Sequence, residues 1–281
     1  MKQTGIQTFI PAKSDIAFKM LFADELNKAF LISFLKAVLK LDIDEYADIQ
    51  IIDPQLKRKR KGDKSGILDV KVRTKAGKII NIEIQLQITS EMRERIVYYG
   101  TKLITEQLQS GDDYELIKKT IPIVIAGEIF LTEHNEYHDV FTLYSQVTGT
   151  EFTDILEIHT LELPKLPAEA DGSELWTWLE FINAESEEEL KMLLKKEPKM
   201  RGPVETLLAV NRDPATRALY EAREKERRDN RARERYALQQ GEAKGRAEGK
   251  AEAKAEEKQN IITLLKSGKS AEEILQLMQK E

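Results

Sequence analysis

Polar side chains alternate with apolar ones along two neighbouring segments of the sequence. Asp69 and Lys71 are two positions apart in the first segment, and Glu83 and Gln85 are two positions apart in the second. Because alternate residues of a β-strand share a face, each pair is expected to project from one side of its strand. If the two strands pair, Asp69 and Glu83 meet on that side, with Gln85 and Lys71 beside them.

Two carboxylates at one point of a sheet predict a Mg²⁺ site. The backbone carbonyl of Ile84 would complete it, since Mg²⁺ keeps several of its waters and needs few protein ligands. Such an ion stabilises charge on a phosphate during cleavage and lowers the pKa of an attacking water. Ordinary cross-strand pairing on a solvent-exposed face explains the same residues without any chemistry. Spacing alone favours this second interpretation, and both remain open.

A run of basic residues precedes the Asp69 segment. It consists of Lys57, Arg58, Lys59, Arg60 and Lys61. Such a run is either a solvated loop or, beside a cleavage site, a loop that binds DNA phosphates. Arg95 begins the helix expected after Glu83, and three interpretations apply to it: a phosphate contact, a partner of Glu83, or an ordinary arginine of a helix surface.

Helical and alternating patterns predict the elements that position these residues. Apolar side chains at three- and four-residue spacing predict helices over 15–22, 25–41 and 91–110, with Asp15 as a cap of the first. Strands are expected over 49–52, 67–72, 79–88 and 121–125. The short turn at 76–78 should join the middle two strands into a hairpin. Strands mixed with helices of these lengths predict an α/β fold around one sheet.

Charge is distributed unevenly along the 281 residues. The net charge of −5 is the sum of −7 on residues 1–220, +2 on residues 221–258 and zero on residues 259–281. An acidic body argues against a protein that coats nucleic acid or anionic membrane generally, although it leaves room for a local basic groove.

Cysteine is absent and only three histidines occur. Disulfides, thiolate nucleophiles and cysteine-ligated metal sites are therefore excluded, and a histidine-rich metal site is not expected. A metal bound by this chain should have mostly oxygen ligands, which suits Mg²⁺, Mn²⁺ or Ca²⁺. No apolar run has the length of a signal peptide or a membrane span, so we expect a soluble cytoplasmic protein with no membrane partner.

Composition also suggests how the chain is divided. We expect an α/β module over 1–165, a helical extension over 166–212, a charged low-complexity helical tail over 213–258 and a short helical pair over 259–281. Within the tail, glycines recur every four residues, at Gly241, Gly245 and Gly249. The tail is either a solvated spacer or a close helix–helix contact that joins copies of the chain into a homo-oligomer.

The chain resembles the PD-(D/E)XK nuclease superfamily, and in particular its recombination-promoting nuclease and transposase family. The resemblance covers about residues 13–184, and its motifs occur in the family's order. These motifs are Asp15-Ile16-Ala17-Phe18-Lys19-Met20-Leu21-Phe22, Leu68-Asp69-Val70, Ile82-Glu83-Ile84-Gln85, Arg95-Ile96-Val97-Tyr98-Tyr99 and Leu161-Glu162-Leu163-Pro164-Lys165. Each motif alone is weak, whereas the ordered set is fairly specific.

The resemblance implies a restriction-endonuclease-like core, a mixed central sheet flanked by helices, and a Mg²⁺-dependent phosphodiesterase that acts on DNA, with Mn²⁺ as a substitute ion. Carried over by position, Asp69 and Glu83 are the metal ligands. Gln85 takes the place usually held by lysine, and a neutral amide holds water but supplies no charge to the transition state. Lys71 is interpreted either as a substitute cation from the neighbouring strand or as a surface lysine.

Three functions follow from these patterns. The first is an active DNA endonuclease that serves recombination or mobile elements. The second is a degenerate nuclease fold that binds DNA without cutting it, and the third is an interaction protein that self-associates through its tail. The intact pair of Asp69 and Glu83 favours the first function, while Gln85 favours the second.

Overall fold

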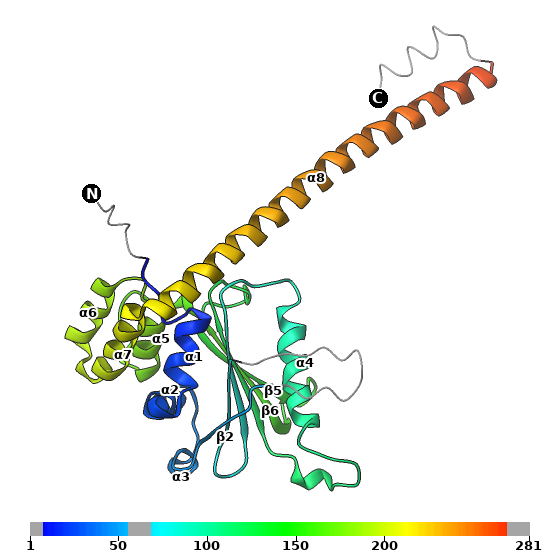
Figure 1. Cartoon of the computed structure of the whole chain (residues 1–281). Helices are drawn as coiled ribbons and strands as arrows, with labels where there is room; N and C mark the ends of the chain where they lie inside the picture. The colour runs from blue at the N-terminus through cyan, green and yellow to red at the C-terminus, as the bar shows by residue number, and fades with distance from the viewer. Residues whose placement is uncertain (1–7, 56–68, 269–281) are drawn as a thin grey trace, which may run out of the picture. The chain divides into compact units, whose positions relative to one another are not determined.

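The computed structural model describes residues 8–55 and 69–268 (Figure 1). The chain forms two compact units, Met1–Tyr220 and Glu221–Glu281. The strands of the first unit are β1 (Gln50–Ile52), β2 (Val70–Arg73), β3 (Ile79–Gln85), β4 (Thr120–Ala126), β5 (His138–Tyr144) and β6 (Glu151–Glu162). They form one sheet in the order β1-β2-β3-β4-β6-β5, in which β4 is parallel to both of its neighbours and the remaining pairs are antiparallel. The expected α/β fold with a mixed sheet is confirmed.

Helices cover both faces of this sheet. They are α1 (Asp15–Phe22), α2 (Lys28–Val38), α3 (Ile43–Tyr46), α4 (Met92–Thr105), α5 (Glu174–Asn183), α6 (Glu187–Lys196) and α7 (Arg201–Arg212). In Figure 1, α4 lies on one side of the sheet, and α1 and α2 lie on the other with α5–α7. The packing agrees, because Ile80 and Ile82 of β3 join the core of α1 and α2, whereas Ile79 of the same strand packs against Leu103 of α4. The odd-numbered residues of β3 therefore face the α4 side.

The predicted hairpin is confirmed as the antiparallel pair β2–β3, in which Val70 lies opposite Ile82 and Arg73 lies opposite Ile79. Gly77 turns the chain with a φ of 87°, a left-handed conformation that glycine adopts without steric penalty. β3 is shorter than expected, since it ends at Gln85. The predicted first residues of the other strand, 67 and 68, lie outside the described part of the chain.

Two details of the N-terminal helices differ from expectation. The cap of α1 is Ser14, whose hydroxyl accepts a hydrogen bond from the Ala17 N–H at 3.3 Å, and Asp15 is the first helical residue. Residues 25–41 are not one helix. Asp24 caps a short 3₁₀ turn instead, by accepting the Leu26 N–H, and this leaves the Leu26 side chain 92% exposed. The following helix, α2, stops at Val38 because the next residue is extended.

The sequence patterns did not predict β5 and β6. β5 is an edge strand, and side chains on both of its faces are exposed, including Val140 and Phe141. β6 carries acidic residues, Asp154 and Glu157, which break the apolar pattern of a core strand. The parallel ladder with β4 defines β6, and the antiparallel pairing with β6 defines β5, so tertiary contacts outweigh the local pattern here.

Helix α4 lies unusually close to the sheet at Gly100. A Cβ atom at this position would stand 2.9 Å from Leu156 Cδ1 and 3.1 Å from Pro122 Cγ. Any larger residue would push the helix away, because such distances are shorter than ordinary carbon contacts. The absence of a side chain at Gly100 therefore sets the height of α4 above β4 and β6, and with it the position of Arg95 one turn earlier.

Helices α5–α7 share one apolar core with α1 and α2. Leu179, Phe181 and Val204 are fully buried in the same cluster as Phe22 and Phe34. The division of the chain at residues 165 and 212 remains a prediction from composition.

A long helix, α8 (Pro214–Lys266), begins in the first unit and forms the described part of the second. No atom lies within 4 Å of a Cβ placed on Gly241, Gly245 or Gly249. Across residues 8–55 and 69–268, no helix is long and apolar enough to cross a membrane.

Candidate active site

The two predicted carboxylates come together where β2 begins beside the end of β3. Continuing the β2–β3 register by one residue places Asp69 opposite Glu83. Asp69 Oδ2 accepts a hydrogen bond from the Ile84 N–H at 3.0 Å, which fixes the carboxylate against β3. The charge of Asp69 is close enough to contribute to the raised pKa of Glu83. The hairpin thus supplies both acids from adjacent strands.

The carbonyl of Ile84 points to the same edge of β3 as its N–H. In an extended strand, the N–H and C=O of one residue face the same neighbour, and successive residues alternate. The Ile84 N–H faces Asp69, and the Gln85 carbonyl faces β4, where it accepts the Gly127 N–H at 2.9 Å. The Ile84 carbonyl is therefore directed toward Asp69, as a third oxygen for a cation would be.

Glu83 is buried among groups that neutralise its charge only weakly. Its residue is 6% exposed, Asn81 Nδ2 donates to Oε1 at 3.1 Å, and Gln85 Nε2 donates to Oε2 at 3.4 Å. Burial raises the pKa of Glu83 above its ordinary value, and Asp69 adds to this, although the Asn81 hydrogen bond and the Arg95 charge oppose it. Arg95 Nη2 stands 3.9 Å from Oε2. A bound cation would stabilise this carboxylate.

Asn81 is hydrogen-bonded to Glu83, and it was not among the residues predicted from the sequence. Its Oδ1 atom is buried without a hydrogen-bond partner in the described part of the chain, while its amide nitrogen binds Glu83. A buried oxygen of this kind calls for a water or a cation, because leaving it unpaired costs about 1–3 kcal/mol. The signal was available, since Asn81 lies two residues before Glu83 on the same face of a strand.

Two lysines near the carboxylates have different partners. Lys71, which was considered as a substitute for the missing lysine, places its Nζ 3.5 Å from Oε2 of Glu106, and both side chains are nearly buried. Lys19 of α1 places its Nζ 3.2 Å from Asp69 Oδ1. Among the described lysines that form ion pairs, the one in contact with Asp69 therefore comes from α1, fifty residues earlier in the sequence. The spacing of the strand residues did not indicate it, although Lys19 lies within the Asp15–Phe22 motif.

Of the cations predicted to bind DNA, the structure describes Arg95 but not the basic run. Arg95 is 44% exposed at its side chain, and its guanidinium lies over the ring of Tyr99 at 5.5 Å from the centroid. It pairs loosely with Glu83 and remains accessible from solvent. The basic run from Lys57 to Lys61 lies outside the described residues.

The donor set fits a hard divalent ion with few protein ligands. Among residues 8–55 and 69–268, no group of three or more acidic or histidine side chains is arranged to hold a metal. A metal at Asp69 and Glu83 would therefore take two carboxylates, the Ile84 carbonyl and water. Mg²⁺ commonly binds through one or two carboxylates while keeping several waters, and Mn²⁺ accepts the same oxygen ligands.

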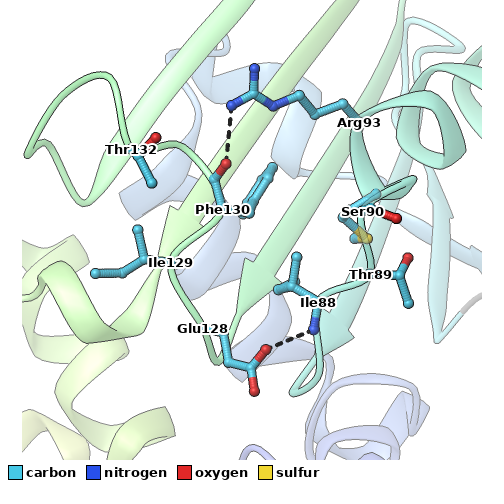
Figure 2. Close-up of a pocket in the computed structure, with 9 residues that line it drawn as sticks. Ile88, Thr89, Ser90, Arg93, Glu128, Ile129, Phe130 and Thr132 are labelled. Atoms are coloured by element: carbon cyan, nitrogen blue, oxygen red, sulfur yellow. Dashed lines mark hydrogen bonds between the residues drawn. The ribbon is translucent and has the colours of Figure 1, made fainter. Parts of the chain in front are cut away.

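A cavity of about 540 Å³ lies at the carboxyl ends of β3 and β4, between the loops that follow these strands (Figure 2). Glu128 crosses between the loops, because its Oε2 accepts the Ile88 N–H at 3.0 Å. Arg93 reaches over the opposite rim to the Phe130 carbonyl at 3.0 Å. None of the predicted site residues lines this cavity. The lining residues are Ile88, Thr89, Ser90, Met92, Arg93, Glu128, Ile129, Phe130 and Thr132.

The Leu161–Lys165 motif holds the second of these loops. Glu162, which is fully buried, accepts the N–H groups of Phe130 and Leu131 at 2.7 and 3.2 Å. Lys165 binds Glu162 at 2.5 Å and donates to the Leu131 carbonyl at 2.6 Å. The motif therefore has a structural explanation, since it fixes the chain after β4.

Comparison with known proteins identifies the family of the chain. Curated proteins and solved structures gave no match to the chain. The family described as PD-(D/E)XK nuclease family transposase matches residues 12–237, which is most of the chain and includes every residue of the carboxylate site. The chain therefore belongs to the PD-(D/E)XK nuclease family transposases.

Proposed function

We propose that this protein is a divalent-metal-dependent DNA endonuclease, in which Asp69, Glu83 and the Ile84 carbonyl hold Mg²⁺ or Mn²⁺. The observation that carries the proposal is the juxtaposition of the two carboxylates at the β2–β3 edge, with Asp69 anchored on the Ile84 N–H. Family membership supplies the substrate class, because the family is one of nucleases. Carboxylates with a raised pKa are frequent at functional sites, and Glu83 has this property.

The reaction is hydrolysis of a phosphodiester. One P–O bond forms to a water oxygen, and one P–O bond to the leaving strand breaks. The water proton passes to the departing oxygen, so that one end carries the phosphate and the other a hydroxyl. When bound, Mg²⁺ supplies charge to the phosphate and lowers the pKa of the attacking water. Gln85 orients that water by hydrogen bonding through its amide, beside Glu83.

Phosphates of the DNA backbone are expected to contact the exposed cations around the site. Arg95 presents a guanidinium that can bind a phosphate through two hydrogen bonds. The basic run Lys57–Lys61 is proposed as a second contact, because it is joined to the Asp69 strand in the sequence. Contacts to phosphate position the duplex without reading its bases.

A degenerate, non-cleaving DNA-binding protein is the second candidate. Gln85 favours it, because a neutral residue stands where the superfamily usually has lysine, and its amide is hydrogen-bonded to Glu83 at 3.4 Å. Both acids are nevertheless present and adjacent, and Asn81 and Gln85 both donate to Glu83. This arrangement favours a working site over a decayed one.

Plasmid cleavage by the purified full-length protein tests the proposal. Supercoiled DNA is incubated with Mg²⁺, Mn²⁺, Ca²⁺ or EDTA, using wild type, Glu83→Gln and Glu187→Gln. Glu187 is a matched control, since it is a carboxylate on α6 paired with Lys191. We expect nicking or linearisation with Mg²⁺ or Mn²⁺ in wild type and in the control, and none in Glu83→Gln or EDTA. DNA binding without cleavage in every metal would support the degenerate alternative instead.

A further inference from the structure

A lysine of α1 lies against the carboxylate pair. Lys19 Nζ is 3.2 Å from Asp69 Oδ1, and its side chain is 40% exposed, whereas that of Asp69 is 14% exposed. The Lys19 side chain is therefore more accessible to solvent than the carboxylate that it contacts. An ammonium group is a compact cation with three donors, so it can contact a carboxylate and a phosphate oxygen at once.

Packing holds Lys19 in this position. Helix α1 begins at the Ser14 cap, and Phe18, Leu21 and Phe22 on its inner face are fully buried. The backbone of Lys19 is thus attached to the main core, and its half-buried side chain leaves the helix beside the buried face and reaches Asp69. A cation on a rigid element can be held ready for the transition state without reorganisation.

Two other cations of the described residues lie near the acids and have different partners. Lys71 is paired with Glu106 at 3.5 Å, and both side chains in this contact are nearly buried, so moving Lys71 to the acids would break this ion pair. Arg95 stands 3.9 Å from Glu83, and its guanidinium also lies over the ring of Tyr99. Among the described lysines that form ion pairs, Lys19 is the one that contacts Asp69 or Glu83.

We propose that Lys19 is the catalytic cation of this site and supplies from α1 the positive charge that Gln85 lacks. This inference rests on the proposed nuclease function. The Lys19 ammonium group donates a hydrogen bond to a non-bridging oxygen of the scissile phosphate as negative charge grows there. It acts by electrostatic stabilisation and takes no proton from the water.

Four variants of the full-length protein test this role. Lys19→Gln removes the charge, Lys19→Arg keeps it, and Lys71→Gln removes the competing lysine. Lys28→Gln is the matched control, because Lys28 also pairs with one carboxylate, that of Glu25, at 3.5 Å and with a similar exposure of 31%. Two quantities are measured for each variant: the cleavage rate at saturating Mg²⁺, and the rise in melting temperature that Mg²⁺ produces.

We expect Lys19→Gln to slow cleavage by about 100-fold, as removal of one preorganised donor does in other enzymes. Its Mg²⁺-induced rise in melting temperature should equal or exceed that of wild type, because a cation beside Asp69 disfavours a second one. Lys19→Arg should retain part of the activity, and Lys28→Gln all of it. Adding Gln85→Lys to Lys19→Gln should restore cleavage, since it returns a cation to the site.

Several results would overturn the inference. Lys19→Gln that cleaves within about threefold of wild type would show that its charge is not used. Loss of the Mg²⁺ effect together with activity would show that Lys19 only holds Asp69 in place, and a larger loss in Lys71→Gln would assign the charge to Lys71. These outcomes leave the nuclease function intact. Wild-type protein that neither cleaves nor gains stability from Mg²⁺ would instead remove the proposed function and this inference with it.

Discussion

Two polar clusters in the same sheet shift the pKa of their glutamates in opposite directions. Glu157 on β6 lies 2.9 Å from His159 Nε2 and 2.8 Å from Lys119 Nζ, and these partners, His159 first, lower its pKa to about 2. Burial instead raises the pKa of Glu83 on β3, whose hydrogen bonds come from two neutral amides. The first carboxylate is stabilised by its neighbours, and the second is destabilised by its surroundings.

The difference separates a structural network from a candidate reaction site. The hydrogen-bond network around Glu157 extends through a 2.9 Å contact between the His138 and His159 rings. Lys119 also forms an ion pair with Asp154 at 3.3 Å. Every charge there has a close opposite charge. At Glu83 the full positive charges stand at greater distance or contact Asp69, so a divalent cation would improve the local electrostatics.

Neutralising either acid of the β2–β3 site should have the largest effect on function. Asp69→Asn and Glu83→Gln are each expected to reduce Mg²⁺-dependent cleavage by at least about 1,000-fold, because an ion with two carboxylate ligands loses one of them. The melting temperature of the metal-free protein should stay the same or rise, since Glu83→Gln removes a buried charge. Cleavage assays and thermal melts without metal check both statements. A large fall in melting temperature with residual cleavage would make the pair structural.

Neutralising Glu157 should have the reverse effect, a loss of stability without a loss of cleavage. Glu157→Gln is expected to lower the free energy of unfolding by about 2 kcal/mol, because Lys119 and His159 lose a charged hydrogen-bond partner. Cleavage per folded molecule should not change, as the residue lies on β6 and not at the β2–β3 edge. Urea denaturation measures the first quantity. Unchanged stability would show that the network contributes nothing and would remove the contrast between the clusters.

Acid should weaken the histidine cluster before it affects Glu157. Burial, followed by the charge of His159, lowers the pKa of His138 from 6.5 to about 4, although Asp139 opposes this and Lys40 reinforces it. The unfolded chain then binds the proton more tightly, so the stability due to neutral His138 is complete above pH 6.5 and is lost as the pH falls toward 4. The stability that ionised Glu157 contributes is lost at lower pH, between pH 4.5 and about 2.

Melting temperatures of wild type and His138→Gln between pH 7.5 and 4 measure this dependence directly. The variant should lose less stability than wild type over the upper part of that range, down to the lowered pKa of His138. Parallel curves for the two proteins would mean that His138 is as easily protonated in the folded state as in the unfolded one.

The smallest effect is expected from removing the second unit. A chain ending at Tyr220 keeps Thr216, which is buried, and Tyr220, which packs on the main core. The described part of residues 221–268 is largely exposed, so its removal should change the melting temperature of the remainder by less than about 2 °C. Calorimetry of the full-length chain and of the chain ending at Tyr220 measures this difference in melting temperature. A broad, uncooperative transition in the shorter chain would show that the second unit supports the fold.

Local periodicity was sufficient to predict the hairpin that places the two acids on adjacent strands. Strand alternation placed Asp69 and Glu83 on one side of a hairpin, and the structure has that hairpin with Asp69 bonded to Ile84. Such a prediction succeeds because both strands and their turn lie within about twenty residues, where register follows directly from the turn. The mixed sheet and its flanking helices also followed from the pattern of elements.

The cationic half of the site depends on tertiary packing and could not be predicted in the same way. Lys71 shares a strand with the acid segment, yet the position of α4 brings Glu106 to it. Lys19 reaches Asp69 only because α1 packs beside the hairpin, an arrangement set by core residues far apart in the sequence. The edge strand β5 was missed for a related reason, since its exposed apolar side chains carry no clear alternation.

Calorimetric titration of the metal-free protein with Mn²⁺ and Mg²⁺ tests the central claim most directly, namely that Asp69 and Glu83 together hold a divalent ion. Wild type, Asp69→Asn, Glu83→Gln and Glu157→Gln are compared under identical conditions. We predict a binding site in wild type and in Glu157→Gln, and its loss in both variants of the β2–β3 pair. Equal binding by wild type and Asp69→Asn, or no binding by wild type, would contradict the account.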